Sequence, residues 1–167
     1  WLMAVINFET AGTFRTDIQN PYTNATGLIQ FMPSTATSLG TTINQLKQMT
    51  HIEQLEWVKK YYWPYRSRIK SFVDLYLATF FPAAIGKPDD WVLQTSRLSP
   101  GISAQQTPVF DTNKDGQVTV GEIKRVILTK APAQYAKYIL EKPATRIITM
   151  LLVAVAMVWM AKEQNWL

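Results

Sequence analysis

Signals that begin and end helices recur at short intervals along this chain, and they limit it to a fold built from short helices. Thr50 to Glu53 and Ser71 to Asp74 match the capping-box pattern, in which a hydroxyl and a carboxylate three residues apart pair with the first free amides of a helix. The first box predicts a helix to about Tyr62. Pro33 suits the first turn of another helix, and Pro82 ends the apolar segment 72–81. Few segments favour a strand.

Length and composition indicate one compact, mainly α domain that carries an appendage. The 167 residues suffice for a hydrophobic core, and 47% hydrophobic against 17% charged residues argues against disorder. Between residues 87 and 108 the composition shifts to Pro, Ser, Gln and Gly. We therefore predict a helical core over 1–90, a loop and following helices over 91–142, and an apolar C-terminal helix over 143–167.

The charge and cysteine content narrow the classes of function. The net charge is +5, and Lys59, Lys60, Arg66, Arg68 and Lys70 lie close together in the sequence. Such a cluster suits the anionic bacterial envelope or nucleic acid, but no nucleic-acid motif accompanies it, and a solvated helix face explains it as well. The chain has no cysteine, so disulfides and thiolate chemistry are excluded.

Glu9 is the first candidate for chemistry. It follows the apolar Val5, Ile6 and Phe8 and precedes a polar loop that leads to the apolar run 27–33, which has Gln30 at its centre. Burial disfavours the charged form of a carboxyl group, and an acid that stays protonated near neutral pH can protonate a leaving oxygen. The alternative for Glu9 is an ordinary salt bridge at a helix end.

Other side chains near Glu9 in the sequence could contact a sugar. The amide of Gln30 could hydrogen-bond one, or it could satisfy backbone groups in its own bend. Phe31 could stack on a sugar ring or belong to the core, and the exposed-looking loop before it offers Tyr22. Asp17 is the nearest second carboxylate, which a hydrolase with two acids would require.

Glu9-Thr10, then Phe14, then residues 25–36 (ATGLIQFMPSTA) resemble the first two motifs of the soluble lytic transglycosylase family at the family's spacing. The resemblance implies a lysozyme-like fold and cleavage of the glycan strands of peptidoglycan. It implies one glutamate that acts first as acid and then as base, leaving a 1,6-anhydro sugar. It places Thr10 and Gln30 near the substrate.

The third motif of that family, a Tyr-Asn-Ala-Gly run, is altered in this chain. Its counterpart is the stretch from Ala78 to Ala84, where Phe81 replaces the tyrosine and Pro82 the asparagine. Phe81, a predicted substrate-binding residue, could keep an apolar contact with the acid but loses the hydrogen bond of the phenolic hydroxyl. Two alternatives to the transglycosylase therefore stay open: a peptidoglycan-binding or structural virion component without activity, and a true muramidase.

Residues 111–122 (DTNKDGQVTVGE) match the EF-hand calcium loop at every diagnostic position. Side-chain oxygens stand at positions one, three and five, a glycine at six and a glutamate at twelve; the predicted ligands are Asp111, Asn113, Asp115, the backbone carbonyl of Gln117, and Glu122. The alternative is a turn that caps the following helix. Pro108 makes the usual incoming helix doubtful, so we predict a structural Ca²⁺ ion rather than a sensor.

The C-terminal region contains fifteen uncharged residues, 147–161, between Arg146 and Lys162. As a helix this segment would be about 22 Å long, shorter than the ~30 Å hydrocarbon layer of a membrane. Flanking cations and tryptophans could bridge part of that difference. A membrane anchor, a buried core helix and a helix packed on a partner chain are all compatible with it.

The sequence thus predicts a peptidoglycan lytic transglycosylase that acts at the cell envelope or periplasm and is stabilised by calcium. No secretion signal is visible before Glu9, and a bacteriophage virion enzyme that opens the cell wall would suit this arrangement. The expected partners are glycan strands, and a membrane or other virion proteins through the C-terminal helix. Nucleic acid is not expected.

Overall fold

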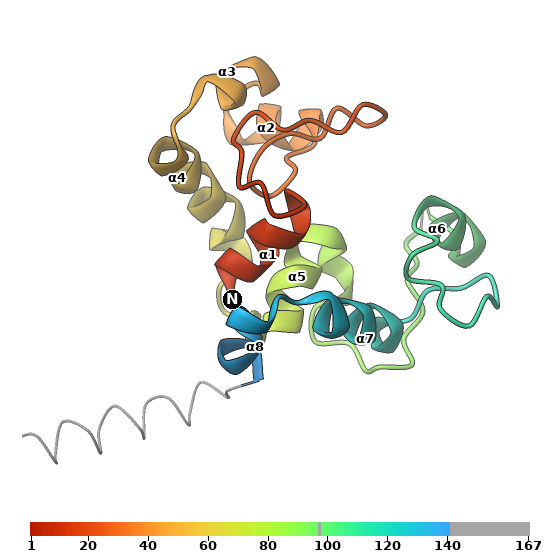
Figure 1. Ribbon diagram of the computed structural model, residues 1–167. Coiled ribbons are helices and arrows are strands. Elements are labelled where there is room, and N and C mark those ends of the chain that lie inside the picture. The colour runs from red at the N-terminus through yellow and green to blue at the C-terminus, as the bar shows by residue number, and fades with distance from the viewer. Residues whose placement is uncertain (97, 141–167) are drawn as a thin grey trace, which may run out of the picture.

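The computed structural model of the protein describes residues 1–96 and 98–140, and these residues are mainly helical (Figure 1). The α-helices are α1 (Leu2–Glu9), α2 (Pro33–Leu39), α3 (Ile43–Gln48), α4 (His51–Tyr62), α5 (Phe72–Phe80), α6 (Pro100–Gln106), α7 (Val120–Lys130) and α8 (Ala133–Leu140), with 3-10 turns η1 (Trp63–Tyr65) and η2 (Pro82–Ala84). Within the described ranges there is no strand, only isolated bridges such as Thr26 with Phe31. The predicted mainly α class is confirmed.

The predicted helix starts are formed by the side chains expected to form them. The Thr50 hydroxyl accepts the amide of Glu53 at 3.3 Å, and the Glu53 carboxylate accepts the amide of Thr50 at 2.8 Å, so α4 begins with a complete capping box. At the start of α5, the Ser71 hydroxyl accepts the Asp74 amide. The Asp74 carboxylate accepts the amide of Lys70 instead of that of Ser71, so this cap is one hydrogen bond short of a box.

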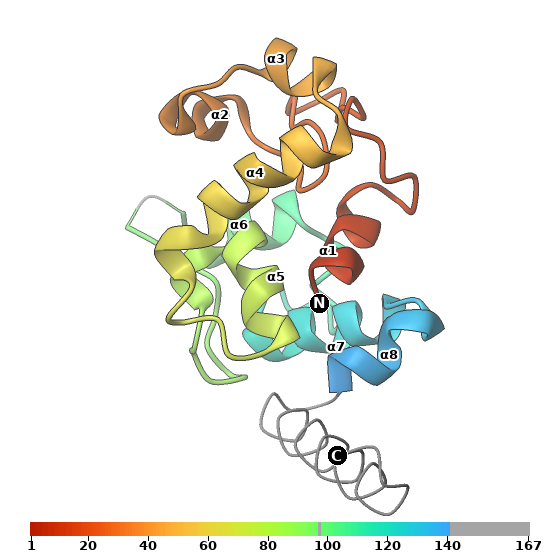
Figure 2. The same cartoon turned by 90° about the vertical axis from the view of Figure 1, so that its left-hand side faces the viewer.

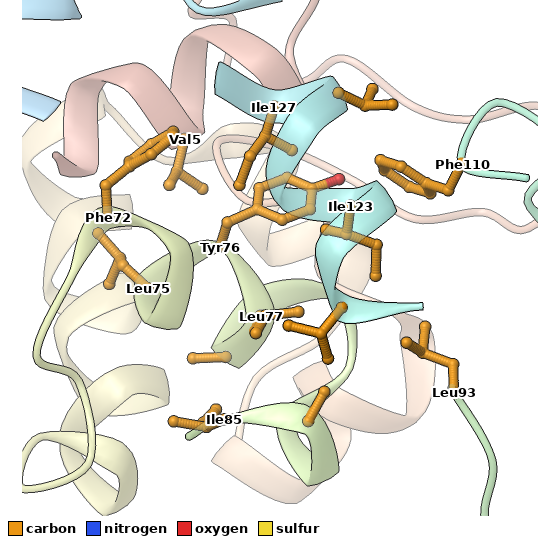
Figure 3. Packing of buried hydrophobic residues seen from close by; sticks show 14 of the residues in the cluster. Val5, Phe72, Leu75, Tyr76, Leu77, Ile85, Leu93, Phe110, Ile123 and Ile127 are labelled. Atoms are coloured by element: carbon orange, nitrogen blue, oxygen red, sulfur yellow. The ribbon is translucent and has the colours of Figure 1, made fainter. Parts of the chain in front are cut away.

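Two clusters of buried side chains hold the helices together, and α1 contributes to both. Val5 packs in the larger cluster, which joins α1, α5 and α7 (Figure 3), whereas the neighbouring Ile6 packs with residues of the 28–31 run, α3 and α4. Figures 1 and 2 show α2 and α3 on one side of α1, and α5, α7 and α8 on the other. Glu9, the last residue of α1, therefore lies where the two parts of the protein meet.

The larger cluster crosses the predicted boundary at residue 90. It combines Phe72 and Ile85 from before that boundary with Leu93, Val118 and Ile123 from after it. The segment that carries the acidic loop is therefore packed directly on α1 and α5 and shares their core.

The predicted apolar C-terminal helix, and with it the whole segment 143–167, lies outside the described residues. The last described helix, α8, ends at Leu140. Among residues 1–96 and 98–140, no helix combines the length and the apolar character that crossing a membrane requires.

Candidate functional site

A tight turn at the end of α1 fixes the position of Glu9. The Thr10 hydroxyl donates to the carbonyl of Ile6 at 2.7 Å and accepts the amide of Phe14 at 3.0 Å. Gly12 then has a φ of +79°, a left-handed conformation that suits glycine. Thr10 is fully buried, so in this structure the predicted substrate contact is a residue that holds the turn behind the acid.

The carboxyl group of Glu9 is in an environment that favours its protonated form. Burial raises the pKa of Glu9 from 4.5 to about 7, and its place at the C-terminal end of α1 acts in the same direction, because the helix dipole is negative there. Within the described residues the carboxyl oxygens have no hydrogen bond or ion pair, and no side-chain oxygen is completely buried without a partner. The carboxyl group is therefore largely desolvated but still reached by solvent.

This environment predicts a pH-dependent stability. Folded Glu9 holds its proton up to pH about 7, whereas the unfolded chain releases it near 4.5, so the folded state loses stability as pH rises through this window and keeps the loss above it. Glu9→Gln is neutral at every pH. Its free energy of unfolding relative to wild type should therefore rise by up to about 3 kcal/mol between pH 5 and pH 8.5.

The measurement is urea unfolding of both proteins at pH 5, 6.5 and 8.5. Asp90→Asn, which removes an exposed carboxylate, is the matched control and should show no such rise. A Glu9→Gln difference that stays constant from pH 5 to 8.5 would contradict the burial of this acid.

Three tyrosines lie close enough to Glu9 for its charge to affect their pKa values. Burial first, and then the negative charge of Glu9 among other nearby groups, raises the pKa values of Tyr61, Tyr62 and Tyr76. Their phenols therefore stay protonated. Tyr61 donates to the carbonyl of Ala78 at 2.7 Å, and Tyr62 pairs with the Thr79 hydroxyl, so α4 is tied to α5 beside the acid.

Tyr76 differs from the other two because its hydroxyl has no hydrogen-bond partner within the described residues. Its ring is buried between α5 and α7 (Figure 3). The ring is in edge contact with that of Phe8, with 5.2 Å between the ring centroids. The phenolic group near Glu9 on α5 is thus that of Tyr76, which lies four residues before the end of this helix. Phe81, the predicted counterpart of the family tyrosine, instead lies beside Trp91, at 6.2 Å between ring centroids.

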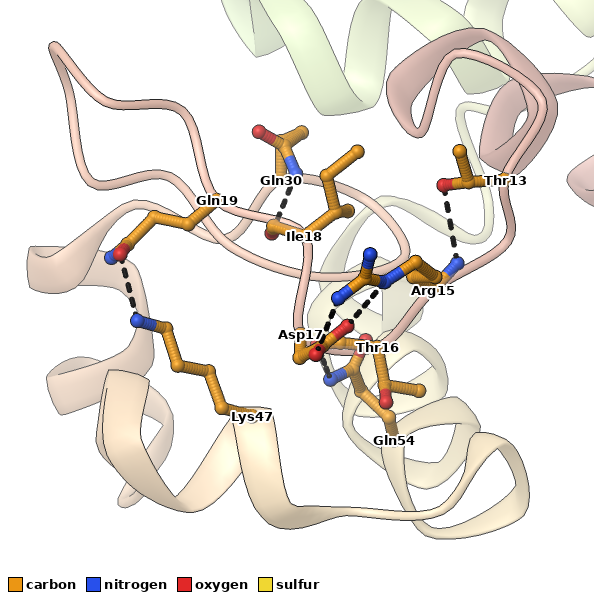
Figure 4. Close-up of polar contacts among 9 residues, drawn as sticks. All are labelled: Thr13, Arg15, Thr16, Asp17, Ile18, Gln19, Gln30, Lys47 and Gln54. Carbon is orange, nitrogen blue, oxygen red and sulfur yellow. Dashed lines mark hydrogen bonds and ion pairs between the residues drawn. The ribbon is translucent and has the colours of Figure 1, made fainter.

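Gln30 is placed inside the bend that it was predicted to occupy. Its backbone φ is +50°, and its side-chain amide donates to the carbonyls of Gly27 at 3.1 Å and Ile18 at 3.4 Å (Figure 4). Of the two roles considered for Gln30, this is the one that satisfies backbone groups. Its half-buried side chain still borders the loop that follows Glu9.

Gln54, which no sequence motif singled out, joins the loop to α4. Gln54 is completely buried; its side-chain oxygen accepts the amide of Leu28 at 2.7 Å, and its nitrogen donates to Thr16 at 3.0 Å and Leu46 at 2.8 Å (Figure 4). Gly27 packs against it so closely that a Cβ there would lie 2.4 Å from the Gln54 oxygen. A glutamine among apolar positions on the inner side of α4 was the only signal.

The remaining predicted residues are spread over different environments. Phe31 is 2% exposed and belongs to the smaller core cluster, so it supports the site from within. Tyr22 is 93% exposed in the loop before α2. Asp17 forms two hydrogen bonds with the guanidinium of Arg15, at 2.9 and 2.8 Å, and this pairing lowers the pKa of Asp17 (Figure 4). Glu9 thus has a raised pKa and the nearest carboxylate in sequence a lowered one.

In the acidic loop, residues 111–122, the side-chain carboxylates accept hydrogen bonds from backbone amides of the same loop. The two oxygens of Asp111 accept the amides of Asp115 and Gly116, both at 3.1 Å, and Asp115 accepts the amide of Gln117 at 2.9 Å. Gly116 has a φ of +79°, which the sharp turn at this position requires. Asn113 joins this network through its own side chain, which accepts from the amide of Asp115.

Glu122 connects the two ends of the loop. One carboxylate oxygen accepts the amide of Thr119 at 2.9 Å and caps α7, while the other accepts the amide of Thr112 at 3.1 Å, near the loop's first residue. Within the described residues, no group of three or more His, Cys, Asp or Glu is gathered closely enough to hold a metal. The donor set of carboxylate, amide and backbone oxygens nevertheless has the chemistry that a hard cation prefers.

The comparisons with known proteins add no relative. No protein-family model, curated protein or solved structure matches the chain.

Proposed function

We propose that this protein cleaves the glycan strands of peptidoglycan without consuming water, and that Glu9 is its catalytic acid and base. The observation that supports this most is the state of the Glu9 carboxyl group: reached by solvent, without a hydrogen-bond partner among the described residues, and with a pKa raised to about 7. The resemblance of residues 9–36 to lytic transglycosylases supplies the substrate and the product.

The reaction begins with protonated Glu9. It gives its proton to the oxygen between N-acetylmuramic acid and N-acetylglucosamine as the bond from that oxygen to the muramic C1 breaks. Glu9, now a carboxylate, then removes the proton from the C6 hydroxyl of the same muramic acid, and the C6 oxygen bonds to C1. One glycosidic bond is lost, one 1,6-anhydro bond is formed, and Glu9 is protonated again.

A pKa near 7 suits both halves of this cycle. An acid with that pKa is still protonated in a large fraction of molecules at neutral pH, and its conjugate base is strong enough to accept a proton from a hydroxyl group. The neutral phenols of Tyr61, Tyr62 and Tyr76 help, because uncharged neighbours do not force the carboxyl group to ionise. Tyr76 is the one of these three phenols without a hydrogen-bond partner among residues 1–96 and 98–140, so its hydroxyl is available to donate to the ionised Glu9.

Two other functions make different demands on the site. A muramidase would use Asp17 as its second carboxylate, but Asp17 is exposed and already bound to Arg15. A binding module without activity is favoured by the phenylalanine at position 81, which removes the hydroxyl expected from the family's third motif.

Digestion of purified murein, followed by mass spectrometry of the released muropeptides, separates the three functions. The proposed activity yields anhydro products, lighter by one water than the products of a hydrolase. Reducing ends without anhydro sugars would replace the proposal with a muramidase. Intact sacculi that retain the bound protein would replace it with a binding module.

We also propose that the loop 111–122 holds one structural Ca²⁺ through Asp111, Asn113, Asp115, Glu122 and the carbonyl of Gln117. Each of the three carboxylates accepts amides of the loop itself: Asp111 those of Asp115 and Gly116, Asp115 that of Gln117, and Glu122 those of Thr112 and Thr119. A cation there would screen the mutual repulsion of three carboxylates and fix the segment that follows Phe110.

Calcium should therefore raise the melting temperature. At 1 mM Ca²⁺, a concentration about 100-fold above a Kd near 10 μM, linkage gives about 2.7 kcal/mol, or several degrees for a chain of this size. Differential scanning calorimetry with Ca²⁺ and with EGTA measures the shift. Asp111→Asn with Asp115→Asn should abolish the shift, whereas equal melting curves for the wild type with and without Ca²⁺ would refute the site.

The proposed substrate places the activity at the bacterial cell wall. The enzyme would reach it from the periplasm, or from a virion during entry. Attachment to a membrane or to other virion proteins was predicted for residues 143–167, which lie outside the described residues.

A further inference from the structure

The solvent-facing side of α4 carries a row of long side chains that belong to neither core cluster. Glu56, Lys59, Lys60 and Trp63 follow the i, i+3, i+4, i+7 spacing that puts residues on one side of a helix. Together with two neighbours they form what we name the α4–η1 surface: Glu56, Trp57, Lys59, Lys60, Trp63 and Arg66.

This surface is hollowed. One hollow of about 500 Å³ is lined by Glu56, Trp57, Lys59, Lys60, Trp63 and Pro64, and a second of about 400 Å³ by Leu2, Lys59, Tyr62, Trp63, Arg66 and Ile69. Both hollows are shallow and open to solvent. Lys59 and Trp63 line both, so the two hollows adjoin along a shared ridge. Glu9 lines neither of them.

Cations are arranged around the indole rings of this surface. The Lys60 ammonium lies 4.7 Å from the centroid of the Trp57 ring, and the Arg66 guanidinium lies 4.3 Å from that of Trp63. Lys60 also donates to the carbonyl of Leu39 and Arg66 to that of Trp63, and Lys59 pairs with Glu56 at 3.6 Å, so these exposed cations keep donors for a ligand only beyond these contacts. Trp63 is nevertheless 57% exposed. Trp57 packs partly against the smaller core cluster, so Trp63 is the ring of this surface whose exposure the core does not explain.

We propose that the α4–η1 surface is a second binding site for the carboxylate-bearing glycan of the cell wall, separate from the Glu9 site. Indole rings stack on the apolar faces of sugars, while Lys59, Lys60 and Arg66 attract the carboxylates of the attached peptides. Hollows suit ring-shaped ligands better than they suit a flat lipid surface. The identity of the polymer rests on the proposed function.

A second site changes what the enzyme does with an insoluble polymer. A strand held on the α4–η1 surface keeps the enzyme at the wall between cleavage events, so the Glu9 site meets a high effective concentration of glycan. The second site should therefore affect digestion of sacculi but not cleavage of a short soluble fragment that cannot reach both sites.

The test uses the 167-residue chain with Glu9→Gln, which cannot digest its ligand, in co-sedimentation with purified sacculi. Adding Trp63→Ala and Lys59→Ala should weaken binding roughly tenfold, because exposed tryptophans in interfaces commonly contribute that much. Both positions are exposed, so folding should be kept, and circular dichroism checks it. The matched control adds Lys130→Ala and Tyr138→Ala, which remove one exposed cation and one exposed aromatic ring elsewhere.

With Glu9 intact, the same Trp63 and Lys59 substitutions should slow digestion of sacculi and leave the turnover of a soluble tetrasaccharide fragment unchanged. Unchanged binding to sacculi would overturn the proposal. Loss of binding to phosphatidylglycerol vesicles, with binding to sacculi kept, would assign the surface to membranes instead. Binding is measured without catalysis. A protein that binds sacculi but never cleaves them would therefore refute the proposed function, whereas the proposal of a binding site on the α4–η1 surface would hold.

Discussion

Replacing Glu9 with glutamine is expected to reduce the release of anhydro muropeptides from murein by at least about 100-fold, the lower end of what general acid–base catalysis contributes. Glutamine has nearly the same shape but can neither give nor accept the proton. The turn through Thr10 does not involve the carboxyl group, so the fold should be kept. Mass spectrometry of timed digests measures the rate.

Two companion variants make this result specific. Asp90→Asn removes an exposed carboxylate outside the site and should digest murein at the wild-type rate. Asp17→Asn distinguishes the rival chemistry, because a muramidase that relies on Asp17 would lose its activity in this variant, whereas the proposed enzyme would not. Full activity of Glu9→Gln would end the assignment of this residue as the catalyst.

Replacing Gln54 with leucine is expected to lower the free energy of unfolding by about 3 kcal/mol or more, because burying an unpaired polar group costs about 1–3 kcal/mol. Leucine fills much of the space but leaves the amide of Leu28 and the carbonyl of Thr16 without the side chain that pairs with them, while the carbonyl of Leu46 keeps only the amide of Met49. With domains of this kind stable by only about 5–15 kcal/mol, the loss should be plain in urea unfolding at pH 7.

Gln48→Leu is the matched control, since Gln48 is an exposed glutamine at the end of α3. It should change the free energy of unfolding by no more than about 0.5 kcal/mol. A Gln54→Leu protein as stable as wild type would mean that water or a local shift replaces the three hydrogen bonds, and that Gln54 does not hold the loop to α4.

Features decided by neighbours in the chain were predictable. The Thr50–Glu53 box, Pro33 at the start of α2 and the end of α5 before Pro82 depend on backbone amides within a few residues, and the structure has all three. The position of Glu9 at the end of an apolar helix was predictable in the same way, but Tyr61, Tyr62 and Tyr76 beside it come from other helices.

Features decided by residues distant in the chain were not predictable. Gln54 bonds to residues 26 and 38 positions away, and no local pattern marks one glutamine of α4 as buried. Tyr61 and Tyr62 are adjacent in a helix, and only the packing of α4 on α5 brings them near an acid at position 9. The same holds for the core that joins residues before and after position 90, which composition had suggested to be separate.

Because Glu9 is carried by the two-turn helix α1, substitutions in the core should lower the activity of the proposed enzyme more than its stability. The adjacent helix residues Val5 and Ile6 are buried in different clusters, so the tilt of the helix depends on the packing on both of its sides. A cavity opened on either side would let the helix lean by a fraction of an ångström, too little to unfold the chain but enough to misalign a proton transfer. Substitutions far from the carboxyl group, in either half of the interior, should therefore impair turnover before they impair folding.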